Sequence, residues 1–454
     1  MRIAFIDLNN GKRFGETNIG LLELISFLSQ RRNDKIEFFD EVDLAINHWR
    51  RFDLMVFSSM GFPLEKFINS KKAKILSHIP ITKIAGGPGP TIIPEKGLIF
   101  ADIVIRGEGE IPLLKIINLT NKIKLKREIL KSNELKGIEN LVFKFNNEVY
   151  KTNRVYYPEL KPSKIDWNII KNLEEYIKRW PYLDYIKGTR GISFVSSRSC
   201  PFNCSFCQPT VREIFGNRMK FKDSDAILEE LLFLRKNYKI NSFMLHDDTF
   251  TINKNRVIEF CDKLISLREK GISFNWICNS RVDTIDEEMA FKMSKAGCKE
   301  VRFGVETIDE EKRNSVLNKG IKDKDIERSI KITKRNKMRA FGFFMLGLPE
   351  QNFRDALKEI RRISSSNLDL ATFSILTPMP GTYLGDKYNV NSFNNYYKSN
   401  RNNISKMSNL SLELTRIFAI ISFYFRPKRF KNTFKQLSSM HTLFYKLRRF
   451  IGSI

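Results

Sequence analysis

The sequence lacks the segments that would carry a protein into or across a membrane. None of its apolar runs approaches the roughly 20 residues that a membrane-spanning helix needs. The N-terminus, MRIAFIDLNNGKRFGE, has too short an apolar run for a secretory signal, since polar residues follow at once. With only six cysteines among 454 residues, the sequence predicts a cytoplasmic protein with reduced thiols and no disulfide framework.

Acidic residues are in deficit as well. The chain has 78 Lys and Arg against 51 Asp and Glu, which gives a formal net charge of +27. Such an excess suits a polyanionic partner or an anionic surface. It equally suits a lysine-rich composition that only keeps the protein in solution, so charge alone identifies no partner.

The first 118 residues alternate between strand and helix patterns. Apolar strand candidates at 2–8, 53–59, 81–87 and 101–107 are separated by segments of helix length, such as 18–32. Near-continuous apolar strands of this kind predict an α/β fold with a doubly wound parallel sheet over residues 1–118. Residues 119–190 are predicted as a connector, with a hairpin around Asn146-Asn147. Ligands of such sheets bind beyond the carboxyl ends of the strands.

The alternation returns at residues 191–390. Strand candidates at 191–197, 242–248, 273–280, 299–306, 339–347 and 371–378 alternate with helical stretches such as 224–238. Six repeated units predict a partial (β/α)6 barrel of the TIM type. Its working face is expected at the C-terminal ends of the strands.

Residues 391–454 are predicted as a basic amphipathic C-terminal tail. Eight Lys or Arg and no acidic residue lie between Arg426 and Arg449, interleaved with Phe and Leu. Such a segment suits the anionic face of a membrane, which gives a possible peripheral location at the inner membrane surface. A helix packed on the barrel with solvated lysines explains the pattern equally well.

Three cysteines stand together after the first predicted barrel strand. Cys200, Cys204 and Cys207 form a C-x3-C-x2-C run, whereas the other three cysteines stand singly. A structural zinc site takes four ligands, and a disulfide would leave one of the three thiols unpaired. Three thiolates suit an iron–sulfur cluster of four irons, in which one iron stays open to a substrate or cofactor. The site is therefore expected on the working face of the barrel.

This loop resembles that of the radical S-adenosylmethionine (SAM) enzymes, in which SAM binds the open iron of a [4Fe–4S] cluster and is cleaved to methionine and a 5′-deoxyadenosyl radical. The segments AGGPGPTIIPE and ADIVIRGEGE resemble the cobalamin-binding domain that precedes some radical SAM barrels. Together they resemble the cobalamin (B12)-binding-domain radical SAM family, which includes class B methyltransferases and anaerobic magnesium-protoporphyrin ester cyclases.

The resemblance implies a set of SAM contacts at the strand ends. Carboxylates after the second strand would meet the SAM amino group, an arginine after the third would lie beside SAM, a glutamate ending the fourth would accept the ribose hydroxyls, and the fifth would back the adenine. The implied residues are Phe206, Asp247, Asp248, Thr249, Arg281, Glu306 and Gly347. His246, also at a strand end, suits an acid/base or, more commonly, a hydrogen-bonded pocket residue.

Cobalamin is implied by the N-terminal domain. Its expected contacts lie after two of the predicted strands, at Ser58, Ser59, Gly86, Gly87 and Gly89. The loop DLNNGKRFG after the first strand lacks the histidine of the D-x-H-x-x-G motif, so the resemblance implies binding without a histidine lower ligand. The open alternative is a domain that kept the fold and lost the cofactor.

The resulting hypothesis is a radical SAM enzyme that methylates an unactivated carbon with the help of cobalamin. A flavodoxin- or ferredoxin-type protein is the expected reductant, and the basic tail favours a hydrophobic substrate of the lipid or tetrapyrrole kind. One alternative is radical cyclisation, coupling or methylthiolation without methyl transfer from cobalamin. Another is a basic iron–sulfur protein that binds nucleic acid, which is less expected because the tail is too short for an added RNA-binding domain.

Overall fold

The computed structural model describes residues 1–9, 11–123, 126–145, 148–207, 209–394, 402–427 and 429. The chain forms two compact units. Unit 1 comprises Met1–Trp180, Ser196–Pro201 and Gln208–Tyr238, and unit 2 comprises Pro181–Val195, Phe202–Cys207 and Lys239–Ile454. The domain boundaries expected at residues 118, 190 and 390 stay predictions.

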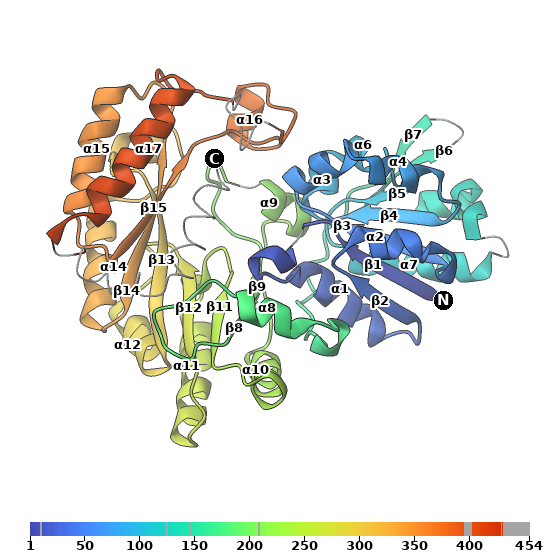
Figure 1. The fold of residues 1–454 in the computed structure, drawn as a ribbon, viewed down its shortest axis with the longest axis horizontal. Coiled ribbons are helices and arrows are strands. Elements are labelled where there is room, and N and C mark those ends of the chain that lie inside the picture. Colours follow the sequence, from blue (N-terminus) through green and yellow to red (C-terminus); the bar gives the residue numbers. More distant parts are fainter. Residues whose placement is uncertain are drawn as a thin grey trace. The chain divides into compact units, whose positions relative to one another are not determined.

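Unit 1 is built on a seven-stranded sheet of order β2-β1-β3-β4-β5-β6-β7, drawn in blue to teal in Figure 1. The first five strands in this order are parallel: β2 (Lys35–Phe39), β1 (Arg2–Asp7), β3 (Leu54–Ser58), β4 (Thr82–Gly86) and β5 (Ile103–Ile105). The predicted doubly wound parallel sheet is therefore confirmed. Strand β2 was not among the predicted strands, because its residues are half exposed at the sheet edge and it has no apolar run.

The predicted hairpin forms, although not as part of a separate connector. Strands β6 (Leu141–Phe145) and β7 (Glu148–Lys151) pair antiparallel, and β6 also pairs antiparallel with β5. The hairpin thus extends the sheet of unit 1. Its predicted turn, Asn146-Asn147, lies outside the described residues.

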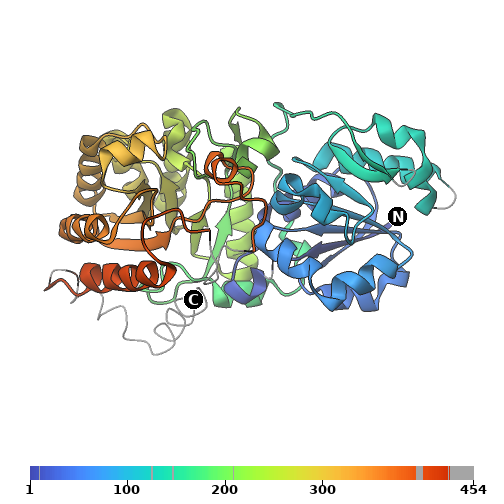
Figure 2. The same ribbon diagram turned by 90° about the horizontal axis from the view of Figure 1, so that it is seen from above.

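Helices bury both faces of this sheet, as Figure 2 shows. Ile3 and Phe5 pack in one cluster with α1 (Ile19–Ser29) and α7 (Glu110–Lys122). Ala4 and Ile6 pack in the other with α2 (Val42–Asn47), α3 (Gly61–Ile68) and α4 (Lys71–His78). Because successive strand residues face opposite layers, a strand buried on both sides must be apolar throughout. Two short helices, α5 (Pro88–Ile92) and α6 (Pro94–Gly97), follow β4.

The rest of unit 1 surrounds the segment that leads to the cysteines. It contains α8 (Leu173–Arg179), α9 (Pro209–Phe215), α10 (Ser224–Tyr238) and the antiparallel pair β9 (Ser197–Arg198) and β10 (Lys220–Phe221). Strand β9 ends two residues before Cys200. The position of this short pair decides where the loop begins.

Unit 2 contains a six-stranded, all-parallel sheet of order β15-β14-β13-β12-β11-β8. Its strands are β8 (Gly191–Phe194), β11 (Ser242–Leu245), β12 (Asn275–Ser280), β13 (Cys298–Glu306), β14 (Arg339–Leu346) and β15 (Leu370–Ile375). Strands neighbour one another in chain order, as repeated βα units of a barrel do. Among the described residues no ladder joins β8 to β15, so the barrel is partial, and the predicted (β/α)6 arrangement is confirmed.

Helices follow each of the later strands of unit 2. They are α11 (Lys254–Glu269), α12 (Glu287–Lys295), α13 (Glu310–Ser315), α14 (Asp323–Arg335), α15 (Phe353–Ser365), α16 (Tyr383–Lys387) and α17 (Asn409–Tyr424). Apart from Arg426, Pro427 and Arg429, the predicted basic segment 426–449 lies outside the described residues. No helix of the described part is long and apolar enough to cross a membrane.

Candidate functional site

The three predicted cluster ligands lie on the loop after β9. Cys200 and Cys204 are half buried and Cys207 is exposed. All six cysteines are within the described residues, and none of them forms a disulfide. Cys261, Cys278 and Cys298 are buried, so the first three thiols are the ones that a ligand can reach.

The loop is fastened to the segment that follows α13. The backbone N–H of Ser205 donates to Leu317 O at 3.0 Å, and its hydroxyl donates to Val316 O at 2.5 Å. A turn closes over the last two cysteines, because Cys207 N donates to Cys204 O at 3.2 Å. Two thiols of the motif are therefore held at the end of unit 2 where its strands terminate.

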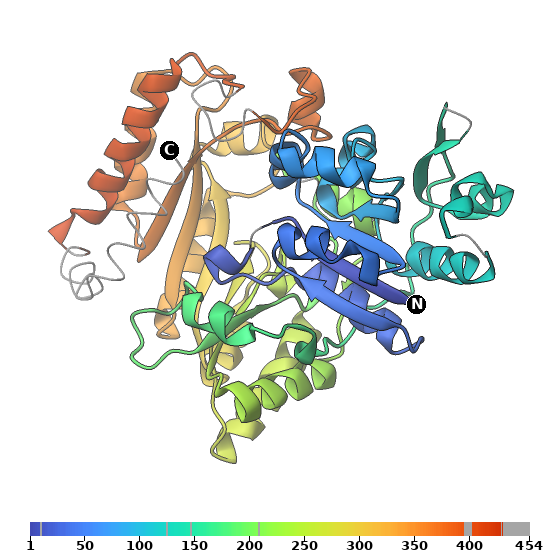
Figure 3. The same ribbon diagram turned by 45° about the vertical axis from the view of Figure 1, so that its right-hand side comes forward.

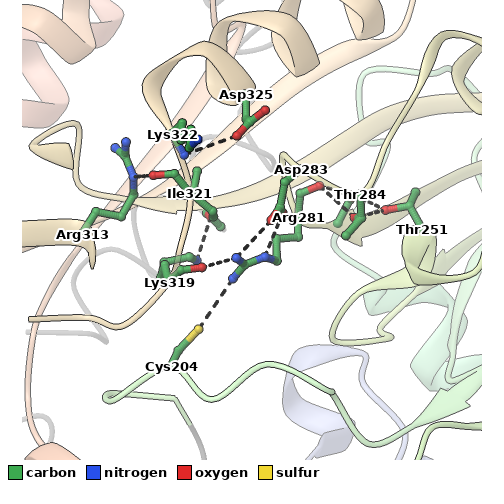
Figure 4. Close-up of polar contacts among 12 residues, drawn as sticks. Cys204, Thr251, Arg281, Asp283, Thr284, Arg313, Lys319, Ile321, Lys322 and Asp325 are labelled. Atoms are coloured by element: carbon green, nitrogen blue, oxygen red, sulfur yellow. Dashed lines mark hydrogen bonds and ion pairs between the residues drawn. The ribbon is translucent and has the colours of Figure 1, made fainter. Parts of the chain in front are cut away.

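Arg281, which follows β12, reaches this loop (Figure 4). Its Nη1 donates to the sulfur of Cys204 at 3.8 Å, and its guanidinium lies 3.8 Å from the ring centroid of Phe202. Asp283 holds the other side of the fork at 2.8 and 3.1 Å, and Lys319 O accepts a further hydrogen bond. The structure thus places Arg281 beside a cluster cysteine, with its bidentate face turned to Asp283; the predicted contact with SAM stays a prediction.

The donor set fits a four-iron cluster. Three thiols that a ligand can reach stand on one loop, and in such a cluster each thiolate binds a different iron. A guanidinium fixed at Cys204 also suits a site that gathers negative thiolate charge.

The two aspartates after β11 have different surroundings. Asp247 is buried, with its carboxylate 3.7 Å from Arg256. Asp248 is exposed, yet desolvation by the protein around it and the negative charge of Asp247 raise the pKa of its carboxyl to about 7. Thr249 is buried and precedes the short 3-10 helix Phe250–Ile252. Asp248 is therefore the carboxylate best placed to meet an ammonium group from solvent.

Glu306 ends β13 in an unusual conformation. Its φ is +70°, and the pairing with β14 shifts register between Gly304 and Glu306. Lys319 donates to the Glu306 carboxylate at 3.0 Å and to Gly304 O at 2.9 Å, and its ammonium lies 5.7 Å from the ring centroid of Phe206. Such backbone strain concentrates at functional sites. Lys319 thereby brings the fourth strand end and the cysteine loop together.

Sequence reasoning missed Lys319. It lies in the loop between α13 and α14, between Asn318 and Gly320, both with positive φ. Only those two neighbours, which favour turns, signalled an unusual conformation there. The contact itself joins segments distant in sequence, so no local pattern predicted it.

Two further predicted residues, Gly347 and His246, make contacts within unit 2. Gly347 has a φ of +81°, its N–H donates to Gln351 at 2.7 Å, and a Cβ there would lie 3.1 Å from Leu412 of α17. His246 Nε2 lies 3.3 Å from the hydroxyl of Tyr182. The latter matches the hydrogen-bonded pocket histidine that the sequence favoured, and the adenine contact of Gly347 stays a prediction.

Unit 1 has a second candidate binding site at the carboxyl ends of β1 and β3. The order β2-β1-β3-β4-β5 is that of flavodoxin-like sheets, whose ligand binds where the strand order reverses. There Asn18 donates to Asp7 at 2.9 Å and to Ser58 at 3.2 Å. Burial raises the pKa of the Asp7 carboxyl. Sequence reasoning placed Ser58 and Ser59 at this edge but missed Asp7 and Asn18.

The glycines after β4 allow close backbone packing at this edge. Gly87 has a φ of +92°, and a Cβ on Gly89 would lie 2.6 Å from Met60 O, whereas one on Gly86 would meet nothing nearer than 3.9 Å. The two histidines of unit 1 lie elsewhere, since His48 follows α2 and His78 ends α4. The glycine backbone leaves room for a bulky cofactor at this edge, and the predicted cobalamin contacts stay predictions.

A buried ionic network surrounds the strand pair before Cys200. Arg198 pairs with Glu23 at 2.6 Å, Glu108 at 3.1 Å and Glu110 at 2.7 Å, and each of these side chains is at most 5% exposed. Lys220 pairs with Glu108, while Lys222 joins Glu23 at 3.0 Å to Glu230 at 3.1 Å. Four carboxylates against three cations leave an excess of negative charge, and burial raises the pKa of Glu108 and of Glu230.

Comparison with known proteins points in one direction. Residues 194–363 match the model of the radical SAM superfamily. The uncharacterized methyltransferase PH0819 of Pyrococcus horikoshii is 30% identical over 373 residues, which cover 78% of this chain and 75% of that protein. The anaerobic magnesium-protoporphyrin IX monomethyl ester cyclase of Rubrivivax gelatinosus is 29% identical over 334 residues, covering 71% of this chain and 57% of the cyclase.

A solved structure shares this fold. The radical SAM methyltransferase TsrM of Kitasatospora setae, determined with cobalamin and a [4Fe–4S] cluster, aligns with a TM-score of 0.67 and 15% identity. The alignment covers 85% of this chain and 74% of TsrM. At this identity the likeness establishes the fold.

Proposed function

Because this chain belongs to the radical SAM superfamily, we propose that it is a cobalamin-dependent methyltransferase acting on an unactivated carbon of a hydrophobic small molecule. A [4Fe–4S] cluster held by Cys200, Cys204 and Cys207 would supply, together with SAM, radical chemistry at the substrate carbon, and cobalamin would supply the methyl group. A flavodoxin- or ferredoxin-type protein is the proposed electron donor. The observation that carries the proposal is the cysteine loop, fastened through Ser205 and contacted by Arg281 at the ends of parallel strands.

The chain's own residues would bind and orient the cofactors. Cys200, Cys204 and Cys207 hold the cluster, and Arg281 balances charge at Cys204. The Asp248 carboxylate accepts the SAM ammonium. Glu306, kept in place by Lys319, accepts hydrogen bonds from the ribose hydroxyls.

Cobalamin is supported by unit 1 and by its relatives. The flavodoxin-like strand order provides a ligand edge between β1 and β3. TsrM, which shares the fold, is described with cobalamin bound. A positive φ at Gly87 and the close packing of Gly89 let the β4 loop approach this edge without side chains in the way.

A hydrophobic substrate is supported by the kind of molecule on which a relative acts. The Rubrivivax enzyme is named for a magnesium-protoporphyrin ester, a large apolar ring system, and it is a cyclase. The chain spans 57% of that enzyme's length and 75% of the uncharacterized methyltransferase. Radical cyclisation without methyl transfer is therefore the second candidate.

The test is anaerobic reconstitution of the full chain with iron, sulfide and cobalamin. We expect four irons per chain, as in a four-iron cluster held by three cysteines. We also expect bound cobalamin, and 5′-deoxyadenosine formed from SAM after reduction. Cys204→Ala should remove the cluster and the cleavage, while Cys261→Ala, at a buried cysteine off the loop, should keep both. If the Cys204 variant still cleaves SAM, the assignment is wrong. Intact SAM cleavage without methyl transfer would favour the second candidate, radical cyclisation.

A further inference from the structure

Helix α17 presents an apolar stripe to solvent. Five large apolar residues at helical spacing are exposed on one face and at its end: Leu410 at 71%, Leu414 at 58%, Phe418 at 45%, Ile421 at 48% and Phe425 at 67%. We call these five residues the α17 stripe. Singly exposed apolar residues are ordinary on a protein surface, but a contiguous row of them marks an interaction site.

The opposite face of α17 is firmly anchored to the barrel. Helix α17 lies along α15 and β15, as Figures 1 and 3 show. The hydroxyl of Tyr424 donates to Ala371 O at 2.8 Å, and the ring of Phe423 lies 6.1 Å from that of Phe373. Arg429, just beyond the helix, donates to Ser364 O at 2.7 Å. The face of α17 opposite the stripe is therefore already packed against the barrel.

The sequence that follows α17 is strongly basic, whereas the charges within the helix cancel. Within α17 the only charged residues, Glu413 and Arg416, pair with each other at 2.9 Å. The sequence that follows, from Arg426 to Arg449, holds eight basic residues and no acidic one. An apolar face next to a run of basic residues is the combination that binds an anionic lipid surface, where apolar side chains enter the headgroup boundary and lysines meet phosphates.

We propose that the α17 stripe is a docking surface for an anionic lipid membrane. The helix has 16 residues and would lie in the interface rather than cross it. A second copy of this chain is disfavoured as the occupant, because each copy carries the same basic segment after α17 in sequence and a net charge of +27. Docking would bring unit 2 to the source of an apolar substrate; the surface itself does not depend on the proposed reaction.

The test uses the full chain and vesicles of phosphatidylglycerol or of phosphatidylcholine, with binding measured by co-sedimentation. We expect binding to the phosphatidylglycerol vesicles that weakens as salt rises. The double variant Leu414→Ser/Phe418→Ser should lower the partition coefficient by about tenfold or more, since burial of both side chains is lost. Phe291→Ser on α12, which removes a phenylalanine 50% exposed, is the matched control and should bind as the unchanged protein does.

Two outcomes would overturn the proposal, and a third would support it. Equal binding by the double variant and the unchanged protein would assign the membrane contact to the basic residues alone. The unchanged protein could instead bind neither kind of vesicle and be dimeric by light scattering, while the double variant is monomeric. That result would show that a second copy of the chain covers the stripe. Loss of vesicle binding with unchanged formation of 5′-deoxyadenosine would separate the surface from the active site and support the proposal.

Discussion

The guanidinium of Arg281 and the sulfur of Cys204 lie within 3.8 Å of each other, although 77 positions separate them in the chain. The same arginine is gripped by Asp283 and by the carbonyl of Lys319. One side chain thus joins the cysteine loop, the end of β12 and the loop before α14. We therefore expect Arg281 to act as a positioning residue for the cluster.

Removal of Arg281 should weaken the cluster without unfolding the barrel. Partners that contact metal ligands typically contribute about 10–100-fold to metal affinity or activity, so Arg281→Ala is expected to lose SAM cleavage and iron by a factor in that range. Arg281→Lys keeps the charge but not the planar guanidinium. Its iron content and rate of SAM cleavage should lie between those of the unchanged protein and of Arg281→Ala. Iron content and the rate of 5′-deoxyadenosine formation measure the effect. An alanine variant with full iron and an unchanged rate would refute it.

Asp248 should make SAM binding depend on pH near neutrality. Its raised pKa, about 7, means that the carboxyl is protonated below that pH and charged above it. SAM should bind more weakly as pH falls below about 7, by at most about tenfold per pH unit. Calorimetric titration between pH 5.5 and 8.5 measures this change. Asp248→Asn should bind weakly with a flat profile, and a sloping profile in that variant would point to another group.

The same shift predicts a stability effect of defined sign. A carboxyl whose pKa is higher in the folded than in the unfolded state destabilises the fold above the unfolded value of about 3.9, and the cost is complete above about pH 7. Asp248→Asn should therefore unfold at a higher temperature than the unchanged protein at pH 8. At pH 4 the two midpoints should coincide. A lower midpoint for the variant at pH 8 would show that the charged form is stabilised.

Lys319 and Glu306 should be energetically coupled. Their side chains are 6% and 12% exposed and 3.0 Å apart. Lys319→Met leaves a largely buried carboxylate without its partner, which costs about 3 kcal/mol or more in the free energy of unfolding. Lys319→Met/Glu306→Gln should recover part of that loss, as a double-mutant cycle in urea would measure. Additive effects of the two changes would contradict the coupling.

Arg198 should stabilise unit 1 in a pH-dependent way. Arg198→Met leaves three buried carboxylates with less positive charge, at an expected cost of about 3 kcal/mol or more at pH 8. Protonation relieves buried carboxylates of raised pKa, so the deficit should shrink as the pH falls toward 5. Lys151→Met, in an exposed pair with Glu95, is the control and should cost under about 1 kcal/mol. A deficit that does not change with pH would show that packing, not charge, is responsible.

The sequence predicted what local patterns determine. Among the described residues, apolar runs located ten of the eleven parallel strands of the two sheets, and the close spacing of Cys200, Cys204 and Cys207 singled out the loop. What it missed depends on long-range contacts. Strand β2 is a half-exposed edge that, among the described residues, pairs with β1 alone. Lys319 and Arg198 acquire their roles from partners far along the chain, and a lysine or arginine alone carries no sign of being buried.

The α17 stripe falls between these cases. The sequence of α17 places apolar residues on its buried face as well as on the stripe, so the pattern alone does not show which face is exposed. Only the packing on α15 and β15 shows which side the protein covers. The basic residues that follow were visible in the sequence, whereas the exposed apolar row beside them required the structure.

The two outer strands of the sheet in unit 1 have a consequence for how this protein avoids aggregation. Unpaired strand edges recruit strands of other chains unless charge discourages them. Here β2 carries Lys35 and Glu37, and β7 carries Glu148 and Lys151 at exposed positions. Because the hairpin β6–β7 pairs with β5, the edge strand of the sheet is the charged β7 and not the short apolar β5. A chain truncated before β6 would expose β5 and should form intermolecular β-structure.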